Sequence, residues 1–122
     1  MAESREYIIG TSADGSVNIS EEVVAVIAIE AMSEVEGFGG TVNALGNIAE
    51  LIGKKSASKG IRVTSDENGI IIDAFVSVKY GHSVADVARS IQSAVFKAVS
   101  DMTGAAVSAV NVNVSGIQFE NK

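Results

Sequence analysis

Few side chains in this sequence have the chemistry of a reactive site. Cys is absent, and the single His, His82, has Asp86 one helical turn further on. A metal site needs a larger set of ligands, and a catalytic triad needs a nucleophile beside the His. Neither pattern surrounds His82, and residues 10–15 lack the Lys-Ser or Lys-Thr ending of a phosphate-binding loop. We therefore expect no enzyme, no metal site and no cofactor, and we interpret His82 as a surface residue.

Basic residues are concentrated in one segment. Four of the nine Lys and Arg residues lie within nine positions, namely Lys54, Lys55, Lys59 and Arg62. Such a cluster can contact phosphate groups or anionic lipid, each charge being worth on the order of 1 kcal/mol near such a surface. The simpler interpretation is a solvated loop. The net charge of −6 opposes phosphate binding by the chain as a whole.

A glycine-rich run at residues 37–40 bears on RNA binding. KH-type RNA modules grip the nucleic acid backbone with a Gly-x-x-Gly loop between two helices, and this Gly-Phe-Gly-Gly run has that bare spacing. Glu34 and Glu36 lie beside it and oppose phosphate binding. A small KH-like module that uses the Lys54 to Arg62 loop is therefore the alternative function, ranked below protein interaction.

An acidic and apolar helix is predicted from Ser20 onwards. Ser20 offers an N-cap hydroxyl, and the first turn carries two carboxylates, which the helix dipole favours. Between residues 23 and 35 apolar side chains occupy nearly the whole circumference, as in a helix that is covered on more than one side. We therefore expect self-association, with a candidate subunit interface made of Glu22, Val26, Ile29, Glu30 and Glu34.

This helix and the basic loop have opposite charges. A contact between them from one subunit to the next would be head to tail, and such contacts propagate into rings or filaments. If the helix faces a subunit, Ala28→Glu or Ile29→Glu should lower the oligomeric mass without unfolding the chain. Unfolding would instead show that the helix is central to the fold.

The chain is organised around a hairpin predicted for residues 61–79. Two β-branched runs flank Asp-Glu-Asn-Gly, and Asn-Gly supplies the positive-φ residues that a tight turn needs. Side chains alternate between the faces of a strand. The face that should meet helices carries Ile70, Ile72, Ala74, Val76 and Val78.

The other face of this hairpin carries polar and aromatic residues. Asp73 should form a cross-strand ion pair with Arg62 if the two arms pair. Phe75 and Tyr80, together with Phe119 near the end of the sequence, form a candidate patch for a protein partner. Ordinary packing at a sheet edge is the competing interpretation of these aromatic residues.

The remaining elements complete an α+β fold. Two short extended pieces are expected within residues 7–19, a second helix from Thr41 on the spacing of Leu45, Ile48, Ala49 and Ile52, a third helix capped by Ser83 and ended by Gly104, and an alternating strand at 107–119. The last strand returns beside the hairpin by a crossover. We expect a two-layer sandwich, with a small sheet built on the hairpin and about three helices on one face.

Length and composition place this fold in one domain. We expect a partly ordered segment at 1–14, one domain at 15–119 and a tail at 120–122. The start of the sequence is too polar for a signal peptide, and no run approaches 18 apolar residues. With no Cys, these features fit a cytoplasmic address.

Laid out in order, these segments resemble the alkaline shock protein family. The resemblance covers roughly residues 15–119, and it rests on the joint order of short pieces. These are Gly-Ser-Val-Asn-Ile-Ser-Glu-Glu-Val-Val at 15–24, Ile-Ala at 27–28, Glu-Val-Glu-Gly at 34–37, Lys-Gly-Ile-Arg-Val at 59–63, Val-Ser-Val-Lys-Tyr-Gly at 76–81, Met-Thr-Gly at 102–104 and Val-Asn-Val-Asn-Val-Ser-Gly-Ile at 110–117.

The resemblance implies a function that composition does not reveal. Members of this family are bacterial proteins linked to the envelope stress response. The resemblance implies a non-enzymatic cytoplasmic protein that self-associates and is recruited to the inner face of the membrane by a membrane-anchored protein partner. The family has no accepted catalytic set, so no catalytic residue is transferred to this sequence.

Overall fold

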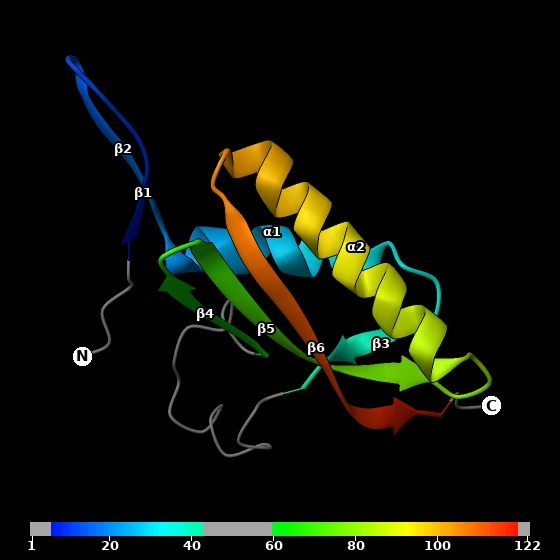
Figure 1. Cartoon of the computed structure of the whole chain (residues 1–122). Coiled ribbons are helices and arrows are strands. Elements are labelled where there is room, and N and C mark those ends of the chain that lie inside the picture. Colours follow the sequence, from blue (N-terminus) through cyan, green and yellow to red (C-terminus); the bar gives the residue numbers. More distant parts are fainter. Residues whose placement is uncertain (1–5, 43–59, 120–122) are drawn as a thin grey trace.

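The computed structural model describes residues 6–42 and 60–119 (Figure 1). The elements in chain order are β1 (Glu6–Ser12), β2 (Gly15–Ser20), α1 (Glu21–Ser33), β3 (Phe38–Thr41), β4 (Ile61–Asp66), β5 (Gly69–Lys79), α2 (Val84–Thr103) and β6 (Val107–Gln118). The protein has the predicted α+β fold, with helices packed on a small sheet.

Strand β5, the second arm of the predicted hairpin, is the centre of the main sheet. β4 pairs antiparallel with residues 69–74 of β5 and β3 pairs antiparallel with residues 76–78, so these two short strands share one edge. β6 pairs parallel with β5 along residues 70–79. A parallel neighbour requires a long crossover, and α2 supplies it. The predicted return of the last strand beside the hairpin is confirmed.

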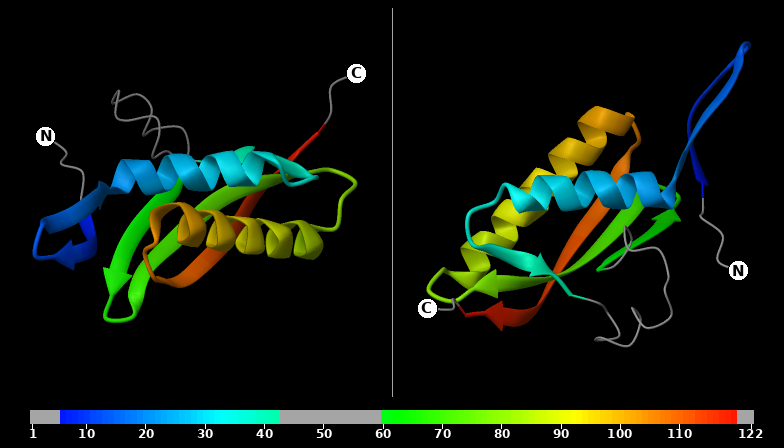
Figure 2. Two further views of the ribbon diagram at one scale, coloured as in Figure 1. Left: turned by 90° about the horizontal axis from the view of Figure 1, so that it is seen from above. Right: turned by 180° about the vertical axis from the view of Figure 1, so that it is seen from behind.

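The core lies between this sheet and the two helices, which cover the same face (Figures 1 and 2). The inward side chains of β5 are all buried, as the alternation predicted. They pack against a stripe of buried residues on each helix, which is Val24, Ala25, Ala28 and Met32 on α1 and Val87, Ile91, Val95 and Val99 on α2. The core is aliphatic throughout, because the sequence offers few aromatic residues.

The turn between β4 and β5 differs in detail from the prediction. The loop consists of Glu67 and Asn68, with Asp66 paired to Gly69, and the Asp66 carboxylate accepts a hydrogen bond from the Asn68 backbone N–H at 2.8 Å. Only Gly69 has a positive φ, of 139°. Asn68 does not, so the prediction that Asn-Gly supplies two positive-φ residues was half wrong. The Asx-type hydrogen bond stabilises the turn instead.

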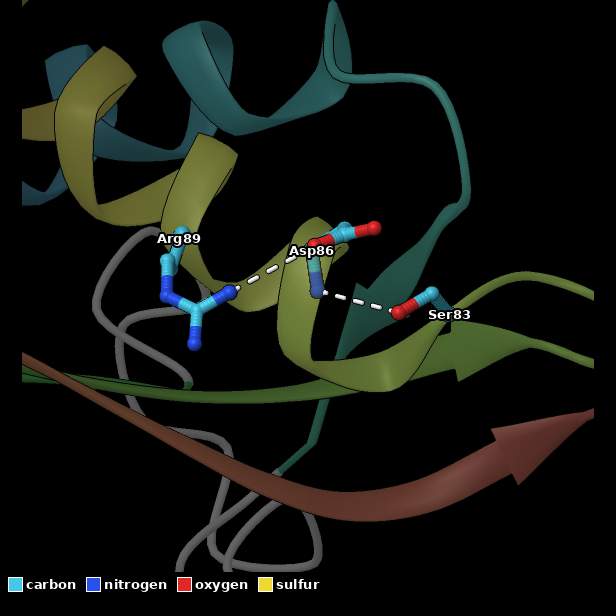
Figure 3. Close-up of polar contacts among 3 residues, drawn as sticks. All are labelled: Ser83, Asp86 and Arg89. Carbon is cyan, nitrogen blue, oxygen red and sulfur yellow. Dashed lines mark hydrogen bonds and ion pairs between the residues drawn. The ribbon is translucent and has the colours of Figure 1, made fainter.

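The helix caps follow the prediction. The Ser20 hydroxyl accepts from the Val23 N–H, and the Ser83 hydroxyl accepts from the Asp86 N–H. Figure 3 shows that the Asp86 carboxylate turns toward Arg89, 3.4 Å away, in an exposed ion pair. Gly104 ends α2 with a φ of 76°.

The N-terminal hairpin projects from the domain. β1 and β2 form a separate two-stranded sheet that extends beyond α1 (Figures 1 and 2). The hairpin confirms the two extended pieces predicted for residues 7–19. Its strands pair across the boundary between residues 14 and 15, where we expected the N-terminal segment to end and the domain to begin. At its base Ile19 packs against the core, whereas Val17 is 58% exposed.

The second predicted helix does not begin at Thr41. Phe38–Thr41 is strand β3, and the Val42 N–H continues its pairing by donating to the Phe75 carbonyl at 2.7 Å. The rest of that predicted helix, including Leu45, Ile48, Ala49 and Ile52, lies outside the described residues. The same holds for Lys54, Lys55 and Lys59 and for residues 1–5 and 120–122. Two helices are therefore described, and both cover the face where about three were expected.

Candidate protein interaction site

A groove runs between α1 and α2 on the side of the helical layer that faces away from the sheet. Its volume is about 630 Å³. Its apolar lining includes Val26, Ile27 and Ala31 of α1 and Ala94, Ala98 and Met102 of α2. Val26 is 50% exposed and Met102 is 71% exposed. Apolar side chains of this size are thus left in water at the mouth of the groove.

Helical geometry explains why α1 is apolar almost all round. Successive residues turn by about 100° around a helix. The stripe that contains Val24 and Ala28 is buried against the sheet. Ile27 and Ala31 lie about one quarter of a turn away, toward α2, and Val26 lies on the solvent side. The prediction that this helix is covered on more than one side is therefore confirmed within a single chain, by the sheet and by α2.

Charged residues line the two rims of the groove unequally. The α1 wall carries Glu30 and Glu34, and the α2 wall carries Lys97 and Asp101. The Lys97 ammonium pairs with the Asp101 carboxylate at 3.2 Å. Among the described residues, no ion pair joins a cation to Glu30 or Glu34. The rim therefore has an acidic wall on α1 and a neutralised pair on α2.

Only some residues of the predicted subunit interface line this groove. Val26, Glu30 and Glu34 line it. Glu22 and Ile29 lie outside it, and Ile29 is half-buried and packs against the core. Sequence reasoning missed the α2 wall, because Met102 continued the stripe of α2 that was expected to be buried. Met102 is exposed although Val99 and Thr103 in the same turn of α2 are buried, so it lies at the margin of the buried stripe.

On the outer face of the sheet, two residues that were predicted to form an ion pair contact other residues instead. Arg62 and Asp73 are directly opposite each other in register, as expected. However, the Arg62 guanidinium lies over the Phe75 ring, 5.4 Å from its centroid, and the Asp73 carboxylate accepts from the Asn111 amide at 2.8 Å. The described residues form no ion pair between Arg62 and Asp73, so that prediction was wrong. The aromatic ring and the neighbouring amide provide better-placed partners than the two charges provide for each other.

The three aromatic residues of the candidate partner patch are not all together. Tyr80 and Phe119 stack with ring centroids 5.1 Å apart, and they are 70% and 67% exposed. Phe75 lies on β5, five residues before Tyr80, which directly follows the end of that strand, and five residues of extended chain span about 16 Å. The structure thus leaves a two-ring patch, with Phe75 paired to Arg62 instead.

His82 and the glycine-rich run lie in contexts without catalytic or RNA-binding geometry. His82 is exposed and lines a shallow depression of about 430 Å³ with Glu36, Ser83 and Asp86. Within the described part of the chain, no group of three or more His, Cys, Asp or Glu residues is arranged to hold a metal ion. Residues 38–40 are in strand β3, paired to β5, and do not form a loop between two helices.

These features define the class of protein, which is a small two-layer α+β domain with an open apolar groove on its helical layer. The model of a protein family described as having a cell envelope-related function matches residues 10–119. The chain belongs to this family, the alkaline shock protein (ASP23) family. The resemblance drawn from the short sequence segments is thereby confirmed.

Several bacterial relatives support the same assignment. The uncharacterized protein YqhY of Bacillus subtilis is 37% identical over 112 residues, which are 88% of this chain and 81% of that protein. YloU of the same organism is 31% identical over 110 residues, covering 88% and 92%. The uncharacterized protein Spy1535 of Streptococcus pyogenes is 38% identical over 109 residues, covering 87% and 81%.

Solved structures of MamM CTD variants are also similar to this chain. One covers 80% of this chain and 95% of its own length at 20% identity, with a TM-score of 0.49. A second covers 80% and 98% at the same identity and TM-score.

In the described residues, no helix is both long enough and apolar enough to span a bilayer.

Proposed function

We propose that this chain is a non-enzymatic interaction protein of the bacterial envelope stress response or envelope homeostasis. In this proposal it self-associates and is recruited to the inner face of the membrane by a membrane-anchored protein partner. The observation that carries the proposal is the apolar groove between α1 and α2. An exposed apolar surface rimmed by polar residues is typical of protein interaction sites.

The titratable residues support interaction over catalysis. In the described residues no metal cluster includes His82, and the neighbouring Ser83 hydroxyl caps α2 by accepting from the Asp86 N–H. The smaller depression at His82 has a mixed polar and apolar lining, whereas the groove between α1 and α2 is mainly apolar and offers side chains that another chain can bury. Burial of apolar surface drives most protein association. The family's cell envelope-related function supports a role for this association at the envelope.

Self-association is tested by light scattering coupled to size exclusion, at low and high salt, with total RNA in a parallel run. We expect a mass well above the 12.5 kDa of one chain at both salt concentrations, because association through apolar surface persists in salt. Val26→Glu and Glu22→Lys, on different sides of α1, identify the side that a second copy uses. A monomer that elutes with RNA at low salt and releases it at high salt would support the RNA-binding alternative and contradict the proposal.

Recruitment is tested by sedimenting the purified chain with membranes. We expect the chain to sediment with inner-membrane vesicles of a bacterium that encodes it, and to lose that binding after the vesicles are treated with protease. Protein-free phosphatidylglycerol vesicles are the control. Equal binding to those vesicles would show a direct lipid contact, to which the Lys54 to Arg62 cluster is suited, and would remove the need for a partner.

A further inference from the structure

We propose that the groove between α1 and α2 binds a basic amphipathic helix of the partner protein. This inference rests on the proposed function and deepens it by naming the chemistry of the partner. It concerns only the groove defined above, lined by Val26, Ile27 and Ala31 on one side and by Ala94, Ala98 and Met102 on the other.

The dimensions of the groove suit a short helix. On α1 the lining runs from Val26 to Ala31 and continues past the end of the helix with Glu34 and Val35, and on α2 it runs from Ala94 to Met102. At 1.5 Å per residue the α2 wall is about 12 Å long, which is slightly more than two helical turns. An amphipathic helix inserts side chains at positions i, i+3, i+4 and i+7 into such grooves. Four apolar side chains over two turns match this length.

The charges on the rim of the groove determine which charge the partner helix should carry. Glu30 and Glu34 are four residues apart, so their carboxylates are neighbours along one wall. On the other wall Lys97 is paired with Asp101. A partner helix with Lys or Arg on the flank that faces α1 would meet two carboxylates. An acidic flank would be repelled, and so would an anionic lipid surface.

A second copy of this chain is a poorer occupant of the groove. Each copy carries a net charge of −6, so a second copy would bring like charges to the acidic wall unless it presented its basic segment from Lys54 to Arg62. Glu22 and Ile29 lie outside the groove and stay available for self-association while a helix occupies it. The groove is thus the site for the heterologous partner.

The test uses a fluorescent synthetic helix of about 14 residues, roughly four turns, with Leu at i, i+3, i+4 and i+7 and Lys on one flank. We expect the full chain to bind this Lys peptide in fluorescence anisotropy, and Glu30→Lys to weaken binding by about tenfold. Glu67→Lys is the matched control, because it makes the same charge change at an exposed position in the β4–β5 turn. We expect it to change binding by less than about twofold.

A second test reverses the charges of both the peptide and the groove. A peptide with Glu in place of Lys should bind the native chain about tenfold more weakly, and should recover when Glu30 and Glu34 are both replaced by Lys. Circular dichroism of each variant confirms that it is folded. Equal weakening by Glu30→Lys and Glu67→Lys, or no binding of the Lys peptide, would overturn the inference.

Light scattering on the same samples separates this inference from the proposed function. Loss of oligomers in Val26→Glu, without peptide binding by the native chain, would show that a second copy occupies the groove. That outcome would overturn the inference and leave the proposed function intact. A monomer that neither binds the Lys peptide nor sediments with native membrane vesicles would contradict both.

Discussion

At the scale of single residues, Gly69 joins three parts of the fold. It begins β5 after the hairpin turn, and it lies against the segment that connects α2 to β6. A Cβ atom at this position would meet the Ala106 carbonyl, with the carbonyl carbon only 2.9 Å away. That carbonyl accepts from the Ile70 N–H at 2.9 Å. The close approach of two backbones therefore requires a residue without a side chain.

Gly69→Ala should accordingly destabilise the domain by about 3 kcal/mol or more, because it combines an unfavourable φ with displacement of the Ala106 backbone. Gly104→Ala is the control. Gly104 also has a positive φ, but a Cβ there meets nothing within 4 Å, so we expect a loss of about 1 kcal/mol. Urea unfolding followed by circular dichroism measures both. Equal losses would show that the contact with Ala106 has no energetic effect.

Sequence reasoning at this scale identified the turn but not its details. Asn-Gly between β-branched runs predicted the hairpin correctly, because few other dipeptides favour so tight a reversal. The approach of Ala106 to Gly69 joins residues that are far apart in sequence, so no local pattern contains it. The contact of Arg62 with Phe75 and that of Asp73 with Asn111 of the neighbouring strand also join residues far apart in sequence. A local pattern could not predict them either.

At the scale of elements, α1 shows how one helix divides its surface among three environments. Its buried stripe contacts the sheet, its flank contacts α2, and Val26 reaches solvent at the groove. Apolar residues around nearly the whole circumference of α1 predicted that the helix has contacts on several sides, and this prediction is confirmed. The pattern could not identify the neighbours, because the same periodicity results whether the second neighbour is α2 or another subunit.

The two sides of α1 should respond oppositely to a charge. Ala28→Glu places a carboxylate in the fully buried stripe and should unfold the domain, because an unpaired buried charge costs several kcal/mol or more. Val26→Glu places it at the half-exposed groove and should change the free energy of unfolding by less than about 1 kcal/mol. Thermal unfolding by circular dichroism compares the two. A cooperatively folded Ala28→Glu variant would contradict the packing of α1 described above.

Strand β3 is the element that sequence reasoning missed. Phe38-Gly39-Gly40-Thr41 has no alternation of polar and apolar residues, and its glycines disfavour a strand. It forms because residues 76–78 of β5 offer an unpaired edge beyond the end of β4. The prediction that a helix begins at Thr41 was therefore wrong, since tertiary pairing overrides the local preference there.

At the scale of the whole molecule, the two sheets differ in their support. β5 has neighbours on both edges and a buried face. Among residues 6–42 and 60–119, the strands of the β1–β2 hairpin pair only with each other, and a two-stranded hairpin is marginally stable in water. The α+β class and the crossover of β6 were predictable from the order of elements. The groove was not, because it depends on how two helices cross, which their individual patterns do not encode.

Amide hydrogen exchange should reveal this difference. We expect amides of residues 70–78 to exchange only through global unfolding, and amides of residues 15–20 to exchange about 1,000-fold faster or more, because local opening of the hairpin exposes them. The measurement is made at several protein concentrations. Equal protection that persists on dilution would contradict the independence of the hairpin, whereas protection that appears only at high concentration would indicate that another copy covers it.

The parallel pairing of β6 with β5 has a consequence for synthesis of the chain on the ribosome. β5 emerges first, and residues 80–106, which include α2, must follow before β6 appears. At about 5–20 residues per second this takes about 1 to 5 s. Throughout that interval the edge of β5 that β6 will cover stays open, and it carries a run of Ile and Val. Long apolar edges of this kind recruit other strands. A nascent chain that stalls before residue 107 would therefore be a target for chaperones or for aggregation.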